Sequence, residues 1–362
     1  QSAEQAGEFD LVTEVKEGVG FIQQQRGRLL GQCPANEDPL TLAAGQLGGK
    51  TLYCTDDFFA EKENLRKPGR GVFIAEKFTD RGKWMDGWES KRKRIAGHDW
   101  VVIQLATQGI IKGLDIDTNF FLGNHPPFAS VEAVNIDNKT EVENWDELPW
   151  VEVVSKNSLD AGSHNYFEVV NENIFTHLRL HIYPDGGVAR FRVYGNVFID
   201  WSKVAENEEI DLASVLWGAS PLACNDMFFS SMENLLLPGK GINMGDGWET
   251  KRNRTANNKD WVIIKLGIPG VIDKIVVDTA HFKGNYPDCC TLEACNCHND
   301  KDVLEDKVNW VTILPSQKLE ADAEHTFEKE IAQNPVCTHV RLNIFPDGGV
   351  SRLRLWGKKQ AY

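Results

Sequence analysis

The most concentrated set of reactive side chains in this sequence is the segment DGWESKRKR at residues 86–94. If the segment is extended, Arg92 and Arg94 lie on one face, because alternate residues of a strand point the same way. Two adjacent guanidinium groups repel each other unless an anion lies between them, and an arginine fork suits a carboxylate. Asp86 and Glu89 are near enough in sequence to hold the arginines or to transfer protons. The segment therefore predicts either a site for a small acid or a network of structural ion pairs.

The same pattern occurs a second time, as DGWETKRNR at residues 246–254. Its Glu249, Arg252 and Arg254 are candidates for the same kind of substrate contact. Arg190 and Arg192 follow a PDGG turn and form an alternative pair for a substrate carboxylate.

Histidine and amide side chains add candidates that differ between the two copies. His98 could move protons, while Asn124 and His125 lie in the loop GNHPP, where an amide could bind an uncharged polar group or close a turn. The second copy has Tyr286 in place of His125, and the counterpart of His98 falls beside an insertion near Asn258. If the chemistry needs His98 or His125, only the first copy can perform it, and the second is a structural or binding copy.

Two other histidines recur in both copies. His177 aligns with His339, and an approximate alignment pairs His164 with His325. A lone histidine is more often a satisfied structural group than a catalyst, so recurrence alone does not assign these side chains to a site.

The sequence leaves metal binding open. Side chains that could bind a divalent ion are present but follow no fixed ligand spacing, namely Asp86, Glu89, His98, Asp117 and His125. No cofactor is assigned, and a divalent metal stays an alternative. The cluster CCTLEACNC at 289–297 does not follow a zinc pattern, and eight cysteines in 362 residues indicate reduced thiols.

The segments that must position these side chains occur as two similar copies along the chain. LYCTDDFFAEKENLRKPGRG at 52–71 returns at 222–241, and THLRLHIYPDGGVARFRVYG at 176–195 returns at 338–357. The first copy has extra residues between Gly71 and Asp86, which we place in a surface loop. The predicted organisation is a flexible N-terminal extension, a first repeat, a linker and a second repeat, at residues 1–39, 40–195, 196–210 and 211–358.

Within each repeat the pattern indicates β-structure. WVVIQL and GLDIDT are short apolar or alternating runs with a Gly-containing turn between them, and HLRLHIYPDGGVARFRVYG is typical of a hairpin. Many short strands with Gly and Pro turns, and few helical stretches, predict an all-β protein of two tandem homologous jelly-roll sandwiches.

The composition of the chain disfavours nucleic acid and membranes as partners. Lys plus Arg number 39 and Asp plus Glu number 53, a formal charge of −14, which opposes binding to nucleic acid or to an anionic membrane. No apolar run approaches the roughly 18 residues of a membrane span. The first thirty residues lack a secretory pattern and the ending KKQAY is not a peroxisomal signal, so we expect a cytoplasmic protein. A homo-oligomer is left open.

The chain also lacks several common catalytic sequences. There is no GxGxxG after a strand, no Walker loop, no GxSxG and no HExxH. Nucleotide-dependent chemistry and the common serine and zinc hydrolases are therefore disfavoured.

The doubled DGWE-[ST]-KR-x-R, together with DDFFA-x-x-ENL, HDWVVIQL, DT-x-x-F-x-GN-x-P and PDGG, resembles the allantoicase family over about residues 40–358. The resemblance implies galactose-binding-like jelly rolls and a hydrolase that converts allantoate and water to ureidoglycolate and urea. Allantoate would then be the small-molecule partner. A non-catalytic ligand-binding protein, or an inactive relative, is the alternative function.

Overall fold

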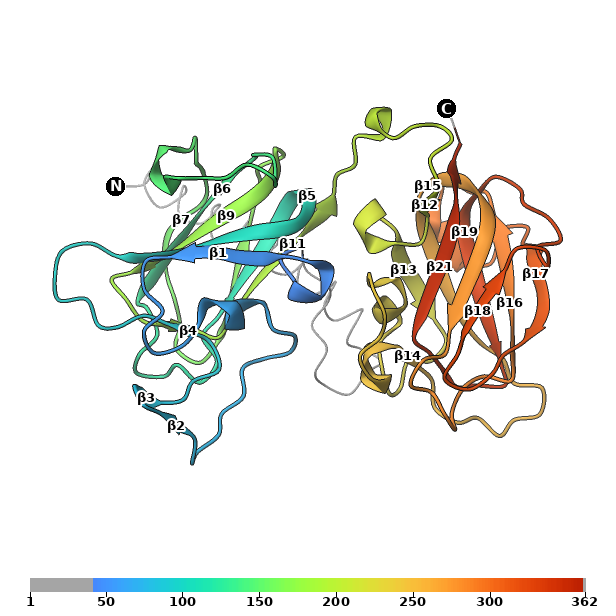
Figure 1. Ribbon diagram of the computed structural model, residues 1–362, viewed down its shortest axis with the longest axis horizontal. Helices are drawn as coiled ribbons and strands as arrows, with labels where there is room; N and C mark the ends of the chain where they lie inside the picture. Colours follow the sequence, from blue (N-terminus) through green and yellow to red (C-terminus); the bar gives the residue numbers. More distant parts are fainter. Residues whose placement is uncertain (1–41, 361–362) are drawn as a thin grey trace, which may run out of the picture. The chain divides into compact units, whose positions relative to one another are not determined.

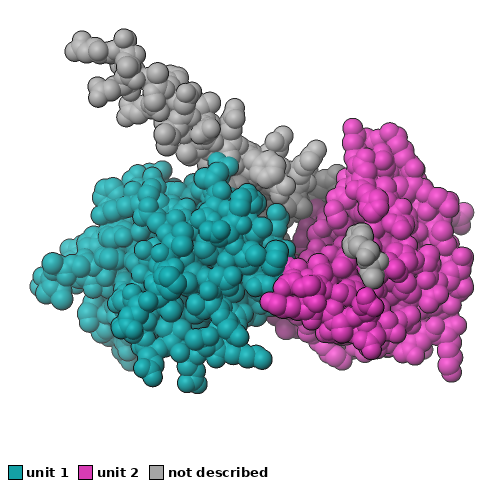
Figure 2. Space-filling view, turned by 90° about the horizontal axis from the view of Figure 1, so that it is seen from above, with its two compact units in different colours: residues 1–29, 36–198 teal, residues 30–35, 199–362 magenta. Residues whose placement is uncertain are grey.

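The computed structural model describes residues 42–360, which form two compact units (Figure 2). Residues 42–198 belong to the first unit and residues 199–360 to the second. The predicted flexible extension, residues 1–39, lies outside the described residues. Within them, no helix is long and apolar enough to cross a membrane.

The first unit is built around one long strand, β5 (Asp99–Asp117) (Figure 1). Its first half pairs with β1 (Lys50–Cys54) and with β9 (Ile174–Tyr183), and the sheet continues through β6 (Phe128–Val134) to β7 (Val151–Ser158). Its second half pairs with β8 (His164–Glu168) and β11 (Arg190–Val197). One strand therefore contributes to both parts of the sandwich, and its apolar residues, such as Val101 and Ile116, are fully buried in the core.

The second unit repeats this topology around β15 (Asp260–Asp278). The partners of β15, and the strands that continue the sheet, correspond one by one to those of β5: β13 (Ser220–Cys224), β19 (Cys337–Phe345), β16 (Cys289–Cys295), β17 (Val311–Lys318), β18 (Glu324–Phe327) and β21 (Arg352–Lys359). A short additional strand, β12 (Ile210–Asp211), pairs with β21.

Two-residue strands and short helical turns lie in the segments between the main strands. The two-residue strand pairs are β4 (Trp88–Glu89) with β10 (Gly187–Val188), β14 (Trp248–Glu249) with β20 (Gly349–Val350), and β2 (Phe78–Thr79) with β3 (Gly82–Lys83). The helical turns are η1 (Gly45–Leu47), η2 (Lys62–Arg66), η3 (Trp145–Glu147), η4 (Trp201–Lys203), η5 (Val215–Trp217), η6 (Met232–Leu236), η7 (Met244–Asp246) and the α-helix α2 (Asp300–Leu304). The β2–β3 hairpin lies in the extra segment of the first repeat and is mostly exposed, as expected of a surface loop.

The predicted all-β fold of two tandem jelly-roll sandwiches is confirmed, but two local predictions were wrong. WVVIQL and GLDIDT belong to the single strand β5. The strands on either side of PDGG do not form a hairpin, because β9 and β11 each pair with β5 and not with each other. Alternation predicted the strands correctly, but strand pairing depends on contacts that are distant in sequence.

Candidate active site

The DGWE segment is held against the PDGG turn at one end of the first sandwich. Glu89 lies opposite Gly187 in the β4–β10 pair, and Trp88 is fully buried in the core. Gly186 has a φ of 139°, in the region that favours glycine, and a Cβ atom on Gly187 would lie only 2.0 Å from the ring of Phe121. The two glycines therefore allow the turn to approach the DGWE segment closely.

The loop that follows Glu89 is fixed through its backbone. Asp56 accepts a hydrogen bond from the Lys91 amide (2.8 Å), and Asp185 accepts one from the Lys93 amide (2.7 Å). The Lys93 ammonium also pairs with the buried Asp99 at 2.7 Å. Asp185 thus does more than form a turn, because it joins the PDGG segment to the basic loop.

Arg92 and Arg94 are exposed on this anchored loop. Within residues 42–360 neither guanidinium forms an ion pair. Arg252 and Arg254 are exposed in the second repeat, where Asp226 and Asp347 accept hydrogen bonds from the backbone amides of Lys251 and Asn253. These four arginines are accessible to an anion.

Glu89 and Asn124 form the central contact of the candidate site. The Asn124 amide Nδ2 donates to Glu89 Oε1 over 2.7 Å. Burial raises the pKa of the Glu89 carboxyl, and the hydrogen bond from Asn124 only partly opposes this effect. The second repeat has the same arrangement, in which Asn285 donates to Glu249 and burial raises the pKa of Glu249. Each repeat therefore presents a carboxyl group suited to donate a proton.

His98 takes part in a polar chain that the sequence did not predict. Its Nε2 lies 2.8 Å from His181 Nδ1, and His181 Nε2 lies 3.0 Å from Glu132 Oε2. Arg179 donates to the same Glu132 oxygen through Nη2 at 2.7 Å and pairs with Asp146 at 2.7 Å. The His98 ring also packs against Tyr183, with ring centroids 4.4 Å apart. A sequence signal existed only in the strand alternation, which places His181 and Arg179 on one face of β9.

An open cavity of about 320 Å³ is lined by Gly97, Pro127, Phe128, Lys156, Tyr183 and Pro184. Gly97 precedes His98 in the sequence, and the Tyr183 ring packs against the His98 ring. The Lys156 ammonium lies 4.2 Å from the centre of the Tyr183 ring and makes no ion pair with any residue of the described chain. This cation was also missed, because nothing in the local sequence of β7 distinguishes it from other exposed lysines.

Asp86, Arg190 and Arg192 have a different environment from Glu89. Arg190 is 2% exposed and pairs with Asp86 over 2.6 Å, and its other donors contact the backbone carbonyls of Gly69, Arg70, Asp86 and Ala189. Burial alone would raise the pKa of Asp86, but Arg190, the Val72 amide and Lys67 together outweigh burial and hold the pKa below its usual range. Arg192 is also buried and donates to the carbonyls of Leu65, Lys67 and Gly69. These contacts correspond to the structural ion-pair alternative, because the donors of both arginines are engaged by backbone carbonyls and by Asp86.

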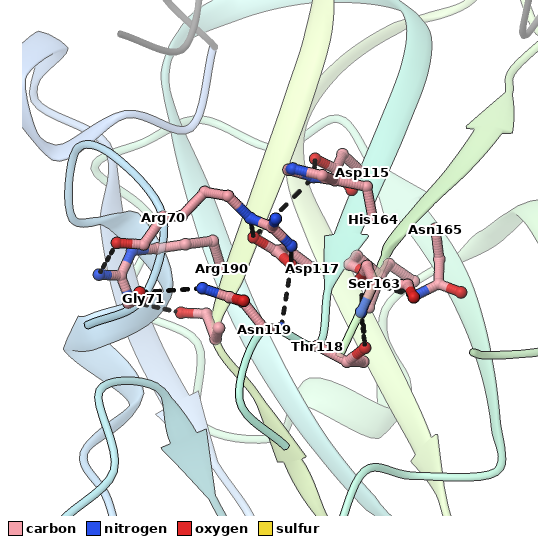
Figure 3. Close-up of polar contacts among 12 residues, drawn as sticks. Arg70, Gly71, Asp115, Asp117, Thr118, Asn119, Ser163, His164, Asn165 and Arg190 are labelled. Carbon is pink, nitrogen blue, oxygen red and sulfur yellow. Dashed lines mark hydrogen bonds and ion pairs between the residues drawn. The ribbon is translucent and has the colours of Figure 1, made fainter. Parts of the chain in front are cut away.

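A further polar cluster anchors the segment before the DGWE loop (Figure 3). Arg70 makes two hydrogen bonds to Asp117, at 2.8 and 3.0 Å, and His164 Nδ1 lies 2.7 Å from Asp115 Oδ2. Asn119 donates to the Gly71 carbonyl at 2.9 Å. Figure 3 shows these side chains converging on β5, so the cluster fixes the Arg70–Gly71 segment to the sandwich.

The proposed equivalence of His164 and His325 is wrong. Register places His164 opposite Asp117, while His325 lies opposite Val277. His325 Nε2 instead accepts from the Glu320 amide, just as Asn165 Oδ1 accepts from the Asp160 amide in the first repeat. An approximate alignment misses this one-residue offset because both strands alternate in the same way.

His177 and His339 are equivalent and buried. Nδ1 of each ring contacts the preceding threonine hydroxyl, at 2.9 and 2.8 Å. His125 is partly buried, and its Nδ1 has no hydrogen-bond partner in the described structure. Among the described residues, no three His, Cys, Asp or Glu side chains come together as a metal-binding group.

Comparisons of the sequence and of the structure with known proteins find relatives of one family. The family model described as "Allantoicase repeat" matches residues 40–198 and 210–360. A "Probable allantoicase" of Pseudomonas fluorescens is 53% identical over 88% of this chain and 96% of its own length. A "Probable allantoicase 1" of Burkholderia mallei is 49% identical over 88% of this chain and 94% of its own length. The crystal structure of Saccharomyces cerevisiae allantoicase superimposes with a TM-score of 0.74 at 40% identity, covering 88% of this chain and 92% of that one.

Proposed function

The chain belongs to the allantoicase family, and on this premise we propose that it hydrolyses allantoate to ureidoglycolate and urea in purine breakdown. The observation that carries the choice of site is the contact between the half-buried Glu89 carboxyl and the Asn124 amide. The segment Tyr183–Gly187 contacts His98 through Tyr183 and pairs with Glu89 through Gly187, which supports a joint role for these two side chains at one end of the sandwich.

The substrate is a carboxylate on a carbon that bears two ureido nitrogens. Hydrolysis forms one bond from the water oxygen to this carbon and breaks one carbon–nitrogen bond. The leaving nitrogen must gain a proton and the water must lose one, so the reaction needs an acid and a base.

Glu89 is the acid in this proposal. Because burial raises its pKa, a larger fraction of its carboxyl groups keep a proton than would in water, and that proton passes to the leaving urea nitrogen. Asn124 holds the carboxyl in place and is available to the ureido groups of the substrate.

His98 is the base. Burial lowers the pKa of His98, against the opposing effect of Asp99, so that the imidazole is neutral and can take the proton of the attacking water. The remaining ureido nitrogen shares its lone pair with the reacting carbon and eases departure of urea. Solvent then returns the proton from His98 to Glu89.

Arg92 and Arg94 bind the substrate carboxylate in this proposal, with His125 as a further contact. Both arginines are exposed and make no ion pair within residues 42–360, which leaves their donors available to a small anion. Glu249, Arg252 and Arg254 are the corresponding substrate contacts of the second repeat.

The test is urea release from allantoate by the full chain. Wild-type protein should release urea, and Glu89→Gln should not, while circular dichroism shows that the variant is folded. A Glu89→Gln protein with near-normal kcat would remove Glu89 from the mechanism. Absence of urea release by the wild-type protein, with binding of an unrelated glycan, would favour the ligand-binding alternative.

A further inference from the structure

The contacts of His98 form one continuous hydrogen-bonded chain. They run from His98 Nε2 to His181 Nδ1, and from His181 Nε2 to Glu132 Oε2. Arg179 holds Glu132 from the other side through Nε (3.0 Å) and Nη2 (2.7 Å). We call His98, His181 and Glu132 the relay residues. They come from the loop before β5, from β9 and from β6, so packing of the sheet fixes their spacing.

The direction of the hydrogen bonds from His98 to Glu132 follows from the charge of Glu132. Burial would raise the pKa of Glu132, but hydrogen bonds from Arg179 and His181 hold it below its usual range, so Glu132 is an ionised acceptor. His181 must then donate from Nε2, and burial lowers its pKa despite Glu132, which leaves His181 Nδ1 unprotonated. His98 therefore donates from Nε2, and its only unprotonated nitrogen is Nδ1.

Nδ1 of His98 is the atom that can accept a proton. No residue of the described chain forms a hydrogen bond to it, and the ring packs against Tyr183, which, like the preceding residue Gly97, lines the open cavity. When Nδ1 takes a proton, the positive charge of the imidazolium is stabilised through His181 by the Glu132 carboxylate.

Other charged groups near His98 are nearly all paired. Lys93 pairs with Asp99, and Arg179 pairs with both Glu132 and Asp146. The titratable and charged groups that face His98 from the loop and the packed strands are Lys93, Asp99, Glu132, Lys156, Arg179, His181 and Tyr183.

The second repeat keeps the counterparts of Glu132 and Arg179 but lacks the two histidines. Arg341 donates to Glu293 at 2.8 Å, as Arg179 does to Glu132. Register places Asn343 where the first repeat has His181, since the two residues lie opposite Trp261 and Trp100. Asn343 donates to Glu293 at 2.9 Å, and Lys259 precedes Asp260 where His98 precedes Asp99.

We propose that His181 and Glu132 are positioning residues, which hold His98 in the tautomer whose Nδ1 accepts a proton, and that hydrolysis is therefore confined to the first repeat. This inference rests on the proposed function for its catalytic meaning. The second repeat, which keeps the Glu249–Asn285 pair but has no base in this position, binds substrate without cleaving it.

The first experiment compares two matched variants of the full chain, Glu132→Gln and Glu293→Gln. Each removes one carboxylate that pairs with an arginine on the neighbouring strand. Glu132→Gln should lower kcat on the order of 100-fold with little change in KM. The acid limb of its pH–kcat/KM profile should move down by about one unit, because an imidazolium without the carboxylate loses its proton more readily.

Glu293→Gln should leave kcat, KM and the pH profile unchanged, although it removes an equivalent ion pair. The same loss and the same shift in both variants would overturn the inference, as would an unshifted profile in a folded Glu132→Gln protein. His181→Asn provides a second route if Glu132→Gln does not fold, because Asn343 already occupies this position in the second repeat. It should show the same loss and shift as Glu132→Gln, and wild-type behaviour would overturn the inference.

A second readout does not depend on activity. Nitrogen-15 NMR of the histidine rings in the wild-type chain should show both His98 and His181 protonated at Nε2 near neutral pH. Protonation of His98 at Nδ1 would overturn the inference. If the expected tautomers are present but allantoate releases no urea, the proposed function fails and the relay geometry stands.

Discussion

The two repeats have the same sheet topology but differ in one polar chain. Both hold a glutamate against an asparagine, as Glu89–Asn124 and Glu249–Asn285, and both expose two arginines on the loop that follows. Only the first repeat has the two histidines that connect this end of the sandwich to Glu132. Both copies therefore keep the glutamate–asparagine contact and the exposed arginines, whereas the two histidines are present in one.

The second repeat shows how the same fold forms without the His98–His181 contact. Asn343 donates to both Glu293 and Thr291, so the half-buried Glu293 carboxylate still has a partner on β19, while Asn343 Oδ1 has none in the described part of the chain. Arg341 stacks on Trp310 at 4.5 Å, as Arg179 stacks on Trp150 at 4.7 Å. The second repeat thus forms the same sandwich with an asparagine at the position of His181, so the fold does not require a histidine there. The presence of the two histidines in the first repeat calls for a chemical explanation.

The largest expected effect comes from replacing the shared glutamate in each repeat separately. Glu89→Gln should lower kcat by roughly 1,000-fold or more, because the amide cannot donate a proton to the leaving urea nitrogen. Glu249→Gln should retain at least about a tenth of the activity, because the second repeat lacks the histidine base. Urea release under saturating allantoate measures both. Equal and near-complete losses would break the distinction between the repeats.

The next prediction compares His98 with Lys259, the residue at the matching position of the second repeat. His98→Gln should reduce kcat/KM by about 100-fold and abolish the acid limb of the pH profile that His98 produces. Lys259→Ala, at the matching position before Asp260, should have no effect on either quantity. An unchanged acid limb in His98→Gln would mean that a different group takes the proton of the water.

Replacing the exposed arginines should have a smaller effect, confined to binding. The double variant Arg92→Ala, Arg94→Ala should raise KM for allantoate by about tenfold at constant kcat, because a charge-assisted contact to a carboxylate is worth about 1.5 kcal/mol. The increase should shrink at high salt, since exposed charges are screened. A fall in kcat without a change in KM would exclude simple carboxylate binding by these side chains.

The sequence predicted local features well and long-range contacts poorly, for a physical reason. Alternation and the doubled segments were enough to predict the strands, the tandem sandwiches and Glu89 as a candidate. The His98–His181 contact joins residues 83 positions apart, and Asp86 and Arg190 are 104 positions apart. Such pairs depend on strand register, which alternation alone does not determine. For the same reason the sequence could not tell that Arg190 is buried in a structural ion pair while Arg92 is exposed.

The smallest expected effect concerns stability, and it should be the same in both repeats. Burial raises the pKa of Glu89 and of Glu249 above the value in the unfolded chain, so the folded state binds protons more tightly. Wild-type stability must therefore fall as pH rises from the unfolded pKa, about 4.3, through the raised folded value. A glutamine has no such ionisation and can still accept the hydrogen bond from Asn124 or Asn285.

Glu89→Gln and Glu249→Gln should each melt about 1–3 °C above the wild-type protein at pH 8, with no difference below about pH 4. Thermal melts across this pH range measure the effect. A lower melting temperature of Glu89→Gln at pH 8 would contradict the description of its carboxyl as destabilised by burial. Matching gains in the two variants, with unequal losses of urea release, would show that the repeats share the buried acid and differ in what surrounds it.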